Sequence, residues 1–227
     1  RTDGRCCTPS RAPVPHIYRN VRLERQRYEM MEASTALRES VRGAYSSAAL
    51  DPDTKHPFPV GAQFAESVGY PPELLKSLPP EASAAFAGVS NVSLTAPIQP
   101  GMKVVDLGCG AGLDSLVAAG RVGCTGRVMG IDFSWEMLRK ALAAAGDKHS
   151  ASNTCFIQGS AEDLPFADAS IDLAMVNGIF NLNPFRDQIF KELARILRTD
   201  GMVAGAELIL RDTLPDELKT GSANWFS

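Results

Sequence analysis

Short apolar runs alternate with stretches of helical periodicity over the second half of the chain. Runs of strand length lie at 103–107, 127–131, 154–158, 171–176 and 202–210. Apolar residues recur every three or four positions between these runs, which is typical of amphipathic helices. These helices are expected at 113–121, 135–145 and 186–198. Strands that alternate with helices predict an α/β fold with a doubly wound, mostly parallel sheet.

The first half of the chain is less regular. Residues 1–17 lack periodicity and predict a flexible tail. Residues 19–42 interleave charged and apolar residues and predict a solvated helix, either a plain surface helix or one that closes over a ligand. Dense prolines between 51 and 80 predict only short helices, near Ala62–Ser67 and Glu73–Ser77. We expect a tail at 1–17, a helical and proline-rich extension at 18–100, and an α/β core at 101–227.

The stretch VVDLGCGAGLDS, from Val104 to Ser115, carries the strongest functional signal. An apolar strand leads into a turn with alternating glycines, Gly108, Gly110 and Gly112, and a helix follows. Glycines remove the Cβ atoms from the turn, so the backbone can approach a ligand closely. The N-terminal amides of the following helix point toward the same place. This arrangement predicts a site for a nucleotide-like cofactor.

The details of the turn favour S-adenosylmethionine over a dinucleotide. Dinucleotide sites have the spacing G-x-G-x-x-G, and Leu113 stands at its last position. Asp106 lies two residues before the first glycine. A carboxylate there suits a cationic amino group, such as that of S-adenosylmethionine, better than a pyrophosphate.

Further acids follow the next strands in order. Asp132 ends the second strand, where an acid can accept hydrogen bonds from ribose hydroxyls. Phe133 comes next and is suited to pack on an adenine face. Either Glu162 or Asp163 is placed to meet the adenine amino group, and Asn177 ends the fourth strand beside the expected cofactor. Ligands of such sheets bind beyond the carboxyl ends of the strands.

Composition narrows the classes of partner. The 227 residues are 44% hydrophobic, enough for a full core, with a net charge of -3. We therefore expect a small-molecule substrate, with no nucleic-acid surface. No apolar run approaches a membrane span of about 20 residues. The spacing of the five cysteines matches no zinc site, so no metal site is predicted. Cys109 and Cys155 are expected to be buried reduced thiols, which favours a cytoplasmic protein. The adjacent cysteines at positions 6 and 7 leave a soft-metal site as a minor alternative.

The motifs DLGCGAG, GID, GSAEDLP, VNG and ARILRTDG resemble those of class I S-adenosylmethionine-dependent methyltransferases. The segments VRGAYSSAA, AGVSN and NGIFNLNP are similar to arsenite methyltransferases, and the resemblance covers about residues 40–214. It implies a Rossmann-like fold, S-adenosylmethionine as cofactor, S-adenosylhomocysteine as product and methyl transfer to a small molecule.

The resemblance also implies roles for particular residues. Asn177 would lie near the sulfonium. Together with Gly112 of the glycine turn, the expected cofactor-binding residues are Tyr45, Asp106, Gly108, Gly110, Gly112, Asp132, Phe133, Ala161, Glu162 and Asn177.

The chain departs from the arsenite methyltransferase pattern at the positions of the metalloid-binding thiols. The resemblance places two of these cysteines where Val89 and Gly178 stand, and the segment DPDTKHPFPV has no thiol. Soft thiolates are the chemically suitable ligands for trivalent arsenic. The methyl acceptor therefore stays open.

The ends of the sequence suggest a fragment. The chain starts at Arg1 without methionine, so we expect a fragment or a processed form. The segment RDTLPDELKTGSANWFS is too short for the two further strands that end a class I sheet. We expect a C-terminally truncated core or a sheet that lacks its last two strands.

No catalytic base is identified. His16 and His149 are expected to be solvated, and His56 is the best placed of the three histidines. The leading hypothesis is a methyltransferase. The alternatives are a catalytically degenerate S-adenosylmethionine-binding scaffold or partner subunit and, less favoured, a nicotinamide-dependent oxidoreductase. The oligomeric state is not indicated.

Overall fold

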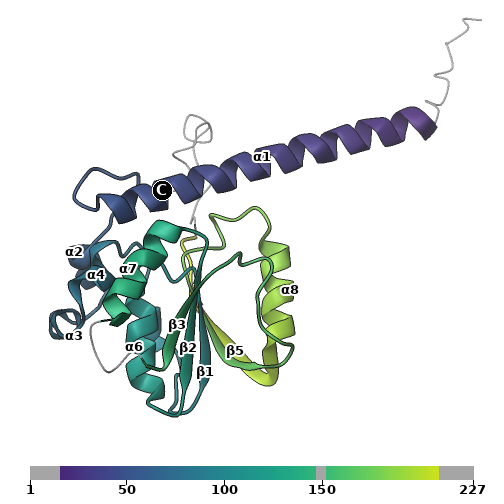
Figure 1. Ribbon diagram of the computed structural model, residues 1–227. Helices are drawn as coiled ribbons and strands as arrows, with labels where there is room; N and C mark the ends of the chain where they lie inside the picture. The colour runs from purple at the N-terminus through teal and green to yellow at the C-terminus, as the bar shows by residue number, and fades with distance from the viewer. Residues whose placement is uncertain (1–15, 147–151, 210–227) are drawn as a thin grey trace, which may run out of the picture. The chain divides into compact units, whose positions relative to one another are not determined.

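The computed structural model describes residues 16–146 and 152–209, with side chains from Glu32 onward. It separates into two units, residues 1–37 and residues 38–227. The first unit contains the start of helix α1 (His16–Leu50), which continues into the second unit (Figure 1). The tail expected at 1–17 lies almost wholly outside the described residues, and the expected division into three parts stays a prediction.

The proline-rich part of the second unit forms short helices, as expected. They are α2 (Ala62–Ser67), α3 (Pro72–Ser77), α4 (Pro80–Ala84) and α5 (Val92–Thr95). Prolines open α3 and α4, where their fixed backbone angle suits a first helical turn and no N–H is missed. The expectation for 19–42 was too short, because α1 runs through Gly43 to Leu50. Helices α4 and α5 had no clear sequence signal.

Five parallel strands form the sheet, which confirms the expected fold class. They are β1 (Lys103–Leu107), β2 (Arg127–Asp132), β3 (Thr154–Gln158), β4 (Ile171–Asn177) and β5 (Leu197–Ala206), in the order β3-β2-β1-β4-β5. Val105 of β1 pairs with Met129 of β2 and with Ala174 of β4. The chain order therefore reverses between β1 and β4, the point at which doubly wound sheets bind ligands.

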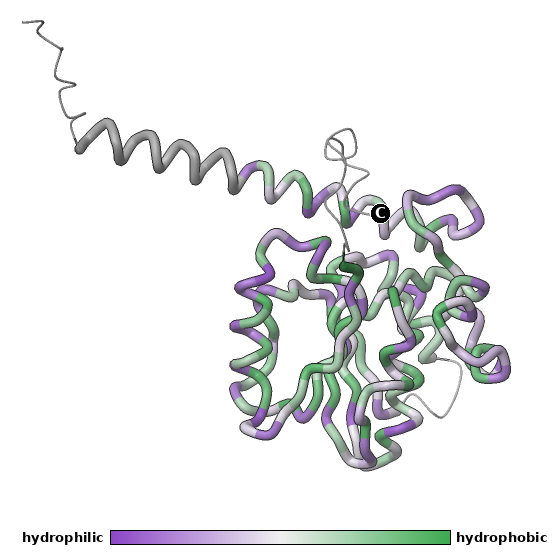
Figure 2. The backbone as a smooth tube through the Cα atoms, turned by 180° about the vertical axis from the view of Figure 1, so that it is seen from behind, coloured by the Kyte–Doolittle hydropathy of each residue, from purple (hydrophilic) through white to green (hydrophobic). Residues whose placement is uncertain are grey.

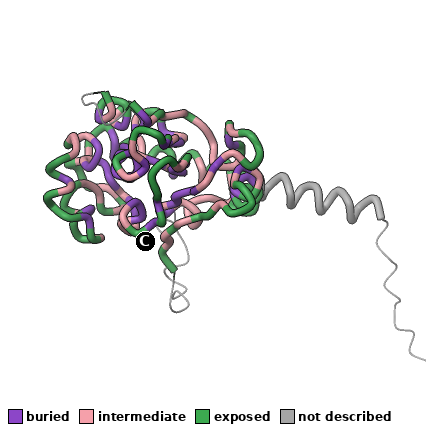
Figure 3. The backbone as a smooth tube through the Cα atoms, turned by 90° about the horizontal axis from the view of Figure 1, so that it is seen from below, coloured by how far each residue is buried: buried purple, intermediate pink, exposed green. Residues whose placement is uncertain are grey.

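Helices cover both faces of the sheet. Figure 1 shows α6 (Leu113–Val122) and α7 (Trp135–Gly146) on one side and α8 (Arg186–Ile196) on the other. Val104 and its neighbours pack against α6, whereas Val105 packs in the cluster that contains α8. Apolar and polar residues alternate along α8 (Figure 2). Figure 3 shows the buried segments gathered inside the second unit.

The boundary between α8 and β5 differs from the expectation of a helix to 198 and a strand from 202. Helix α8 ends at Ile196, and β5 already pairs at Leu197 with Ile171. The register then shifts, and pairing resumes with Met202 opposite Leu173. The Asp200-Gly201 turn signal thus marks an irregularity inside the strand. The two further strands discussed above concern residues after 209, outside the described part.

The cysteine expectation was half right. Cys109 is buried inside the glycine turn, but Cys155 is exposed. Its strand, β3, lies at the edge of the described sheet, so it has a neighbour on one side only. Within the described residues, no helix is both long enough and apolar enough to cross a membrane.

A matched pair of substitutions tests the core. Leu173 on central strand β4 is fully buried, whereas Leu142 on α7 is 44% exposed. We expect Leu173→Ala to lower the free energy of unfolding by about 2–5 kcal/mol, because it leaves a cavity. Leu142→Ala should change it by less than about 0.5 kcal/mol. Urea denaturation measures both, and equal losses would contradict the packing described here.

Candidate cofactor site

A cleft opens at the carboxyl ends of β1, β2 and β4. Its walls come from the end of α1, the segment 82–88, the glycine turn, and the loops that follow β2, β3 and β4. The space between the side chains amounts to about 980 Å³, part of it open to solvent.

The glycine turn forms the floor of the cleft. Gly108 and Gly110 both have positive φ, 73° and 53°. The amides of Gly108 and Cys109 donate to the carbonyl of Ile131, at 2.8 and 2.9 Å, which ties the turn to β2. A Cβ atom at Gly108 would lie only 2.5 Å from Cγ2 of Ile179. The turn therefore requires glycine for its backbone angles and for its close neighbour.

Asp132 holds the turn from the end of β2. One carboxylate oxygen accepts the amide of Gly110 at 2.8 Å, and the other accepts the amide of Ser134 at 2.8 Å. Asp132 also lines the cleft, so its remaining lone pairs are available to a ligand. Burial raises the pKa of Asp132 to about 6, and these amide hydrogen bonds oppose the rise.

Asp106 lies behind the turn and not in the wall of the cleft. It is 2% exposed, and the hydroxyl of Ser115 donates to its carboxylate at 2.6 Å. Burial, followed by the nearby charge of Asp114, raises the pKa of Asp106 to about 8. The expected contact between Asp106 and an amino group of the ligand stays a prediction.

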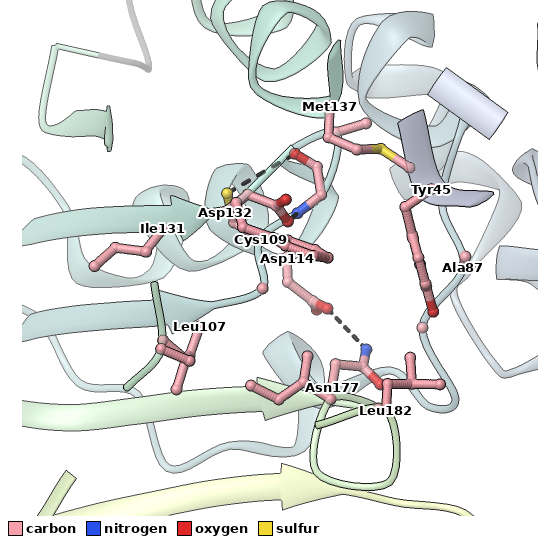
Figure 4. Close-up of a pocket in the computed structure, with 18 of the residues that line it drawn as sticks. Tyr45, Ala87, Leu107, Cys109, Asp114, Ile131, Asp132, Met137, Asn177 and Leu182 are labelled. Carbon is pink, nitrogen blue, oxygen red and sulfur yellow. Dashed lines mark hydrogen bonds between the residues drawn. The ribbon is translucent and has the colours of Figure 1, made fainter. Parts of the chain in front are cut away.

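A buried polar network joins the first turn of α6 to the end of β4. Asp114 accepts hydrogen bonds from the hydroxyl of Tyr70, from the amide of Ser93 at 2.9 Å and from the side-chain amide of Asn177 at 2.9 Å. Figure 4 shows Asp114 and Asn177 pointing toward one another within the cleft. The expected position of Asn177 in the wall agrees with the structure, but its amide is engaged by the protein.

Glu162 belongs to a second polar cluster at the other end of the cleft. Its carboxylate accepts hydrogen bonds from Ser160 and from Asn183, the latter at 2.9 Å, and pairs with Arg38 at 3.4 Å. Burial acts to raise the pKa of Glu162, but the hydrogen bonds outweigh it and the pKa is lowered. Glu162 is therefore ionised at neutral pH. Asp163, the alternative, is exposed and does not line the cleft.

Tyr45 forms part of the wall contributed by α1. Its ring stacks on Phe58 with centroids 4.5 Å apart. Burial raises its pKa, and the charge of Asp132 adds to the rise, so the phenol keeps its proton. It can therefore donate a hydrogen bond to a ligand.

The structure brings most of the expected residues together. Those that line the cleft are Tyr45, Gly108, Gly110, Asp132, Phe133, Ala161, Glu162 and Asn177. Gly112 does not line it: a Cβ there would lie 3.0 Å from Cβ of Ala141, so this glycine serves the packing of α6 against α7. Contact of each residue with a ligand stays a prediction.

Sequence reasoning missed three residues of the site. Asp114 lies two residues after the third glycine, and an acid in the first turn of that helix was the available signal. Arg38 and Tyr70 reach the site only through folding, and nothing local marked them. The best candidate base, His56, bonds the carbonyl of Asp51 at 2.8 Å and does not line the cleft. Across 16–146 and 152–209, no group of three or more potential metal ligands lies together.

The cleft is negatively charged. Its wall contains Asp114, Asp132 and Glu162 against a single cation, Arg38, and Asp106 stands behind it. Buried carboxylates without matching cations favour a positively charged ligand.

The comparisons with known proteins agree on one family. The model of a family described as a methyltransferase domain matches residues 98–226. An arsenite methyltransferase from Halobacterium salinarum is 34% identical over 158 residues, 70% of this chain and 40% of that protein. The chain belongs to the methyltransferase-domain family.

Two further relatives show how broad this family is. A demethylmenaquinone methyltransferase from Desulfitobacterium hafniense is 38% identical over 122 residues, 53% of this chain and 47% of that protein. The crystal structure of an arsenic(III) S-adenosylmethionine methyltransferase from Chlamydomonas reinhardtii matches with a TM-score of 0.54 at 30% identity. That match covers 69% of this chain and 52% of the other. The chain thus spans less than half the length of these two curated relatives.

S-adenosylmethionine is the cofactor of this methyltransferase fold, and the residues present fit it. The glycine turn lines the cleft, and a Cβ at Gly108 would displace Ile179, another residue of its wall. Asp132 has free carboxylate lone pairs in the cleft, and the negative wall suits a ligand that carries a sulfonium and an amino group.

Removing the Asp132 carboxylate should weaken cofactor binding. We expect Asp132→Ala to reduce the affinity for S-adenosylmethionine by about 10- to 100-fold, because charge-assisted hydrogen bonds are lost. The matched control is Asp163→Ala, an exposed acid outside the cleft, which should leave affinity unchanged. Isothermal titration calorimetry measures both. Unchanged binding by Asp132→Ala would show that the site is assigned wrongly.

The raised pKa of Asp132 predicts pH-dependent binding. The carboxyl is ionised above about pH 6 and neutral below it. From about pH 7 to about pH 5 the affinity for the cationic cofactor should therefore fall by about tenfold, since one unit below the pKa only about a tenth is ionised. Calorimetry at both values tests this. The dependence of the affinity on pH should be weaker in Asp132→Ala. An unaltered dependence would assign the titration to another group.

Proposed function

We propose that this chain is the cofactor-binding part of an S-adenosylmethionine-dependent methyltransferase that acts on a small, apolar acceptor. The observation that carries the proposal is the cleft in which Asp132, the glycine turn and the negative wall converge beside the switch point of the sheet. The names of the relatives support methyl transfer, to arsenite or to a quinone precursor, as the general reaction.

The cofactor supplies an activated methyl group on a sulfonium, which becomes a neutral thioether when an acceptor lone pair takes the methyl group. The residues of this chain then have to bind and orient the cofactor and the acceptor, and to exclude water. Asp132 and the glycine turn are placed to hold one end of the ligand. Tyr45, with its protonated phenol and its stack on Phe58, is placed to cover it.

The described wall contains neither histidine nor lysine. Glu162 accepts hydrogen bonds from Ser160 and Asn183 and pairs with Arg38, and Cys109 is a buried thiol whose pKa burial raises further. Asp132, whose pKa is raised to about 6, is assigned to the cofactor, so no separate base is assigned to an acceptor that must lose a proton. This supports a substrate that is already nucleophilic at neutral pH, such as a soft anion or an electron-rich ring carbon.

The positions that carry thiols in the arsenite methyltransferase pattern form an apolar contact here. Val89 lies against Gly178: a Cβ at Gly178 would be 3.1 Å from Cγ1 of Val89. Gly178 also has a positive φ of 79°, a backbone conformation that disfavours cysteine. These features support an apolar acceptor over trivalent arsenic held by thiolates. No observation favours the scaffold alternative.

A methyl-transfer screen tests the proposal. Radiolabelled S-adenosylmethionine is incubated with the chain and one acceptor at a time: a naphthohydroquinone, a small thiol, or arsenite with thiol. We expect transfer to the hydroquinone or the thiol to exceed the no-acceptor background, and to disappear in Asp132→Ala. Dominant methylation of arsenite would contradict the apolar acceptor, and no transfer to any compound would contradict the enzyme assignment for this chain.

A further inference from the structure

Asn177 has no hydrogen-bonding capacity left for a ligand. A side-chain amide offers two acceptor sites and two donors. The oxygen of Asn177 accepts the amides of Val89 and Ser90, at 2.8 and 3.2 Å. Its nitrogen donates to the carbonyl of Ser90 at 2.7 Å and to Asp114 at 2.9 Å. All four positions are used within the protein, although the residue lines the cleft.

The loop that contacts Asn177 has no room to shift toward it. A Cβ at Gly88 would lie 2.4 Å from the side-chain nitrogen of Asn177. The next residue along the loop, Val89, touches the next residue after β4, Gly178. Two consecutive loop positions therefore rest on two consecutive positions at the end of the strand. Both Gly88 and Gly178 belong to the wall of the cleft, so this contact sets the shape of that wall.

Asp114 anchors the same contact from the opposite side. Its carboxylate is 5% exposed and holds the hydroxyl of Tyr70, the amide of Ser93 and the side chain of Asn177. Tyr70 itself is buried, with its ring edge-on to Phe86 at 5.4 Å between centroids. The network thus links the helix after the glycine turn, the end of β4 and the loop at 88–93.

We propose that Asp114 and Asn177 are positioning residues that act as one unit: they fix the 88–90 loop against the end of β4, and so align the wall beside the transferred methyl group. The proposal rests on the proposed function for its last step only. The cofactor is held elsewhere, by Asp132 and the glycine turn. The unit should therefore govern the rate of transfer more than cofactor affinity.

A residue swap tests whether the two side chains act together. Asp114→Asn places two amide nitrogens face to face, and Asn177→Asp places two carboxylates face to face. The double variant Asp114→Asn/Asn177→Asp keeps the net charge and restores a donor opposite an acceptor between 114 and 177, but it leaves the carbonyl of Ser90 without its donor. The matched control is Asp172→Asn, the same chemical change at the start of β4, where the side chain pairs with Arg198 outside the cleft.

Hydrogen exchange of the Val89 and Ser90 amides is the first readout. Each single variant should speed their exchange by about tenfold or more, because the bonds to Asn177 weaken. The double variant should return part of this protection, through the restored contact between 114 and 177, and the control should exchange as the wild type does. Exchange that stays unchanged in both single variants would overturn the proposal.

Kinetics with the best acceptor from the screen is the second readout. Each single variant should lower kcat by about 100-fold, as a misaligned site does, while the KM for S-adenosylmethionine changes by less than about threefold. The double variant should recover at least about tenfold in kcat. If kcat falls in Asn177→Asp but not in Asp114→Asn, and the double variant does not recover it, then Asn177 acts directly on the ligand. That outcome would overturn the proposal.

Two controls keep the outcomes distinct. Tyr70→Phe removes the hydroxyl's bonds to Asp114 and Ser93 but keeps the ring packed on Phe86, so it should fold and show the same kinetic pattern in weaker form. If the single variants at 114 or 177 do not fold, Tyr70→Phe tests the proposal in their place. If the wild type transfers no methyl group, the proposed function fails, and exchange together with calorimetric affinity still judges the network.

Discussion

The bond pair between Asp132 and the amides of Gly110 and Ser134 is the interaction on which the site depends. The glycine turn has backbone angles that few residues adopt, and such a loop keeps its shape only when its surroundings hold it. Asp132 supplies that hold from a neighbouring strand and orders the start of α7 at the same time. Its carboxylate therefore connects three elements and still faces the cleft. A ligand bound there meets a preformed surface, so little ordering is required on binding.

Charge gives this surface its selectivity. Asp114, Asp132 and Glu162 line a cleft whose described wall contains one arginine, Arg38. Burial acts to raise the pKa of such groups: at Asp132 amide donors oppose the rise without cancelling it, whereas at Glu162 hydrogen bonds and the charge of Arg38 lower the pKa. A positively charged ligand completes the balance, whereas a pyrophosphate would add to the repulsion. This electrostatic argument agrees with the family.

Local sequence patterns predicted the elements and the floor of the site, because these depend on neighbours in the chain. The glycine spacing and the acids at strand ends could be recognised from the sequence for this reason. The β5 boundary was not, since pairing with Ile171 overrides the Asp200-Gly201 turn signal. The Asp114–Asn177 contact joins residues 63 positions apart and has no local signature. The saturation of Asn177 and the hydrogen bonds and ion pair of Glu162 also became visible only when their partners were placed.

The most direct test of the account is a calorimetric titration of this chain with S-adenosylmethionine, S-adenosylhomocysteine and NAD. The account predicts one-to-one binding of the first two in the cleft, weakened for S-adenosylmethionine when Asp132 is replaced by alanine, and no binding of NAD. Binding of NAD with no binding of S-adenosylmethionine would contradict it.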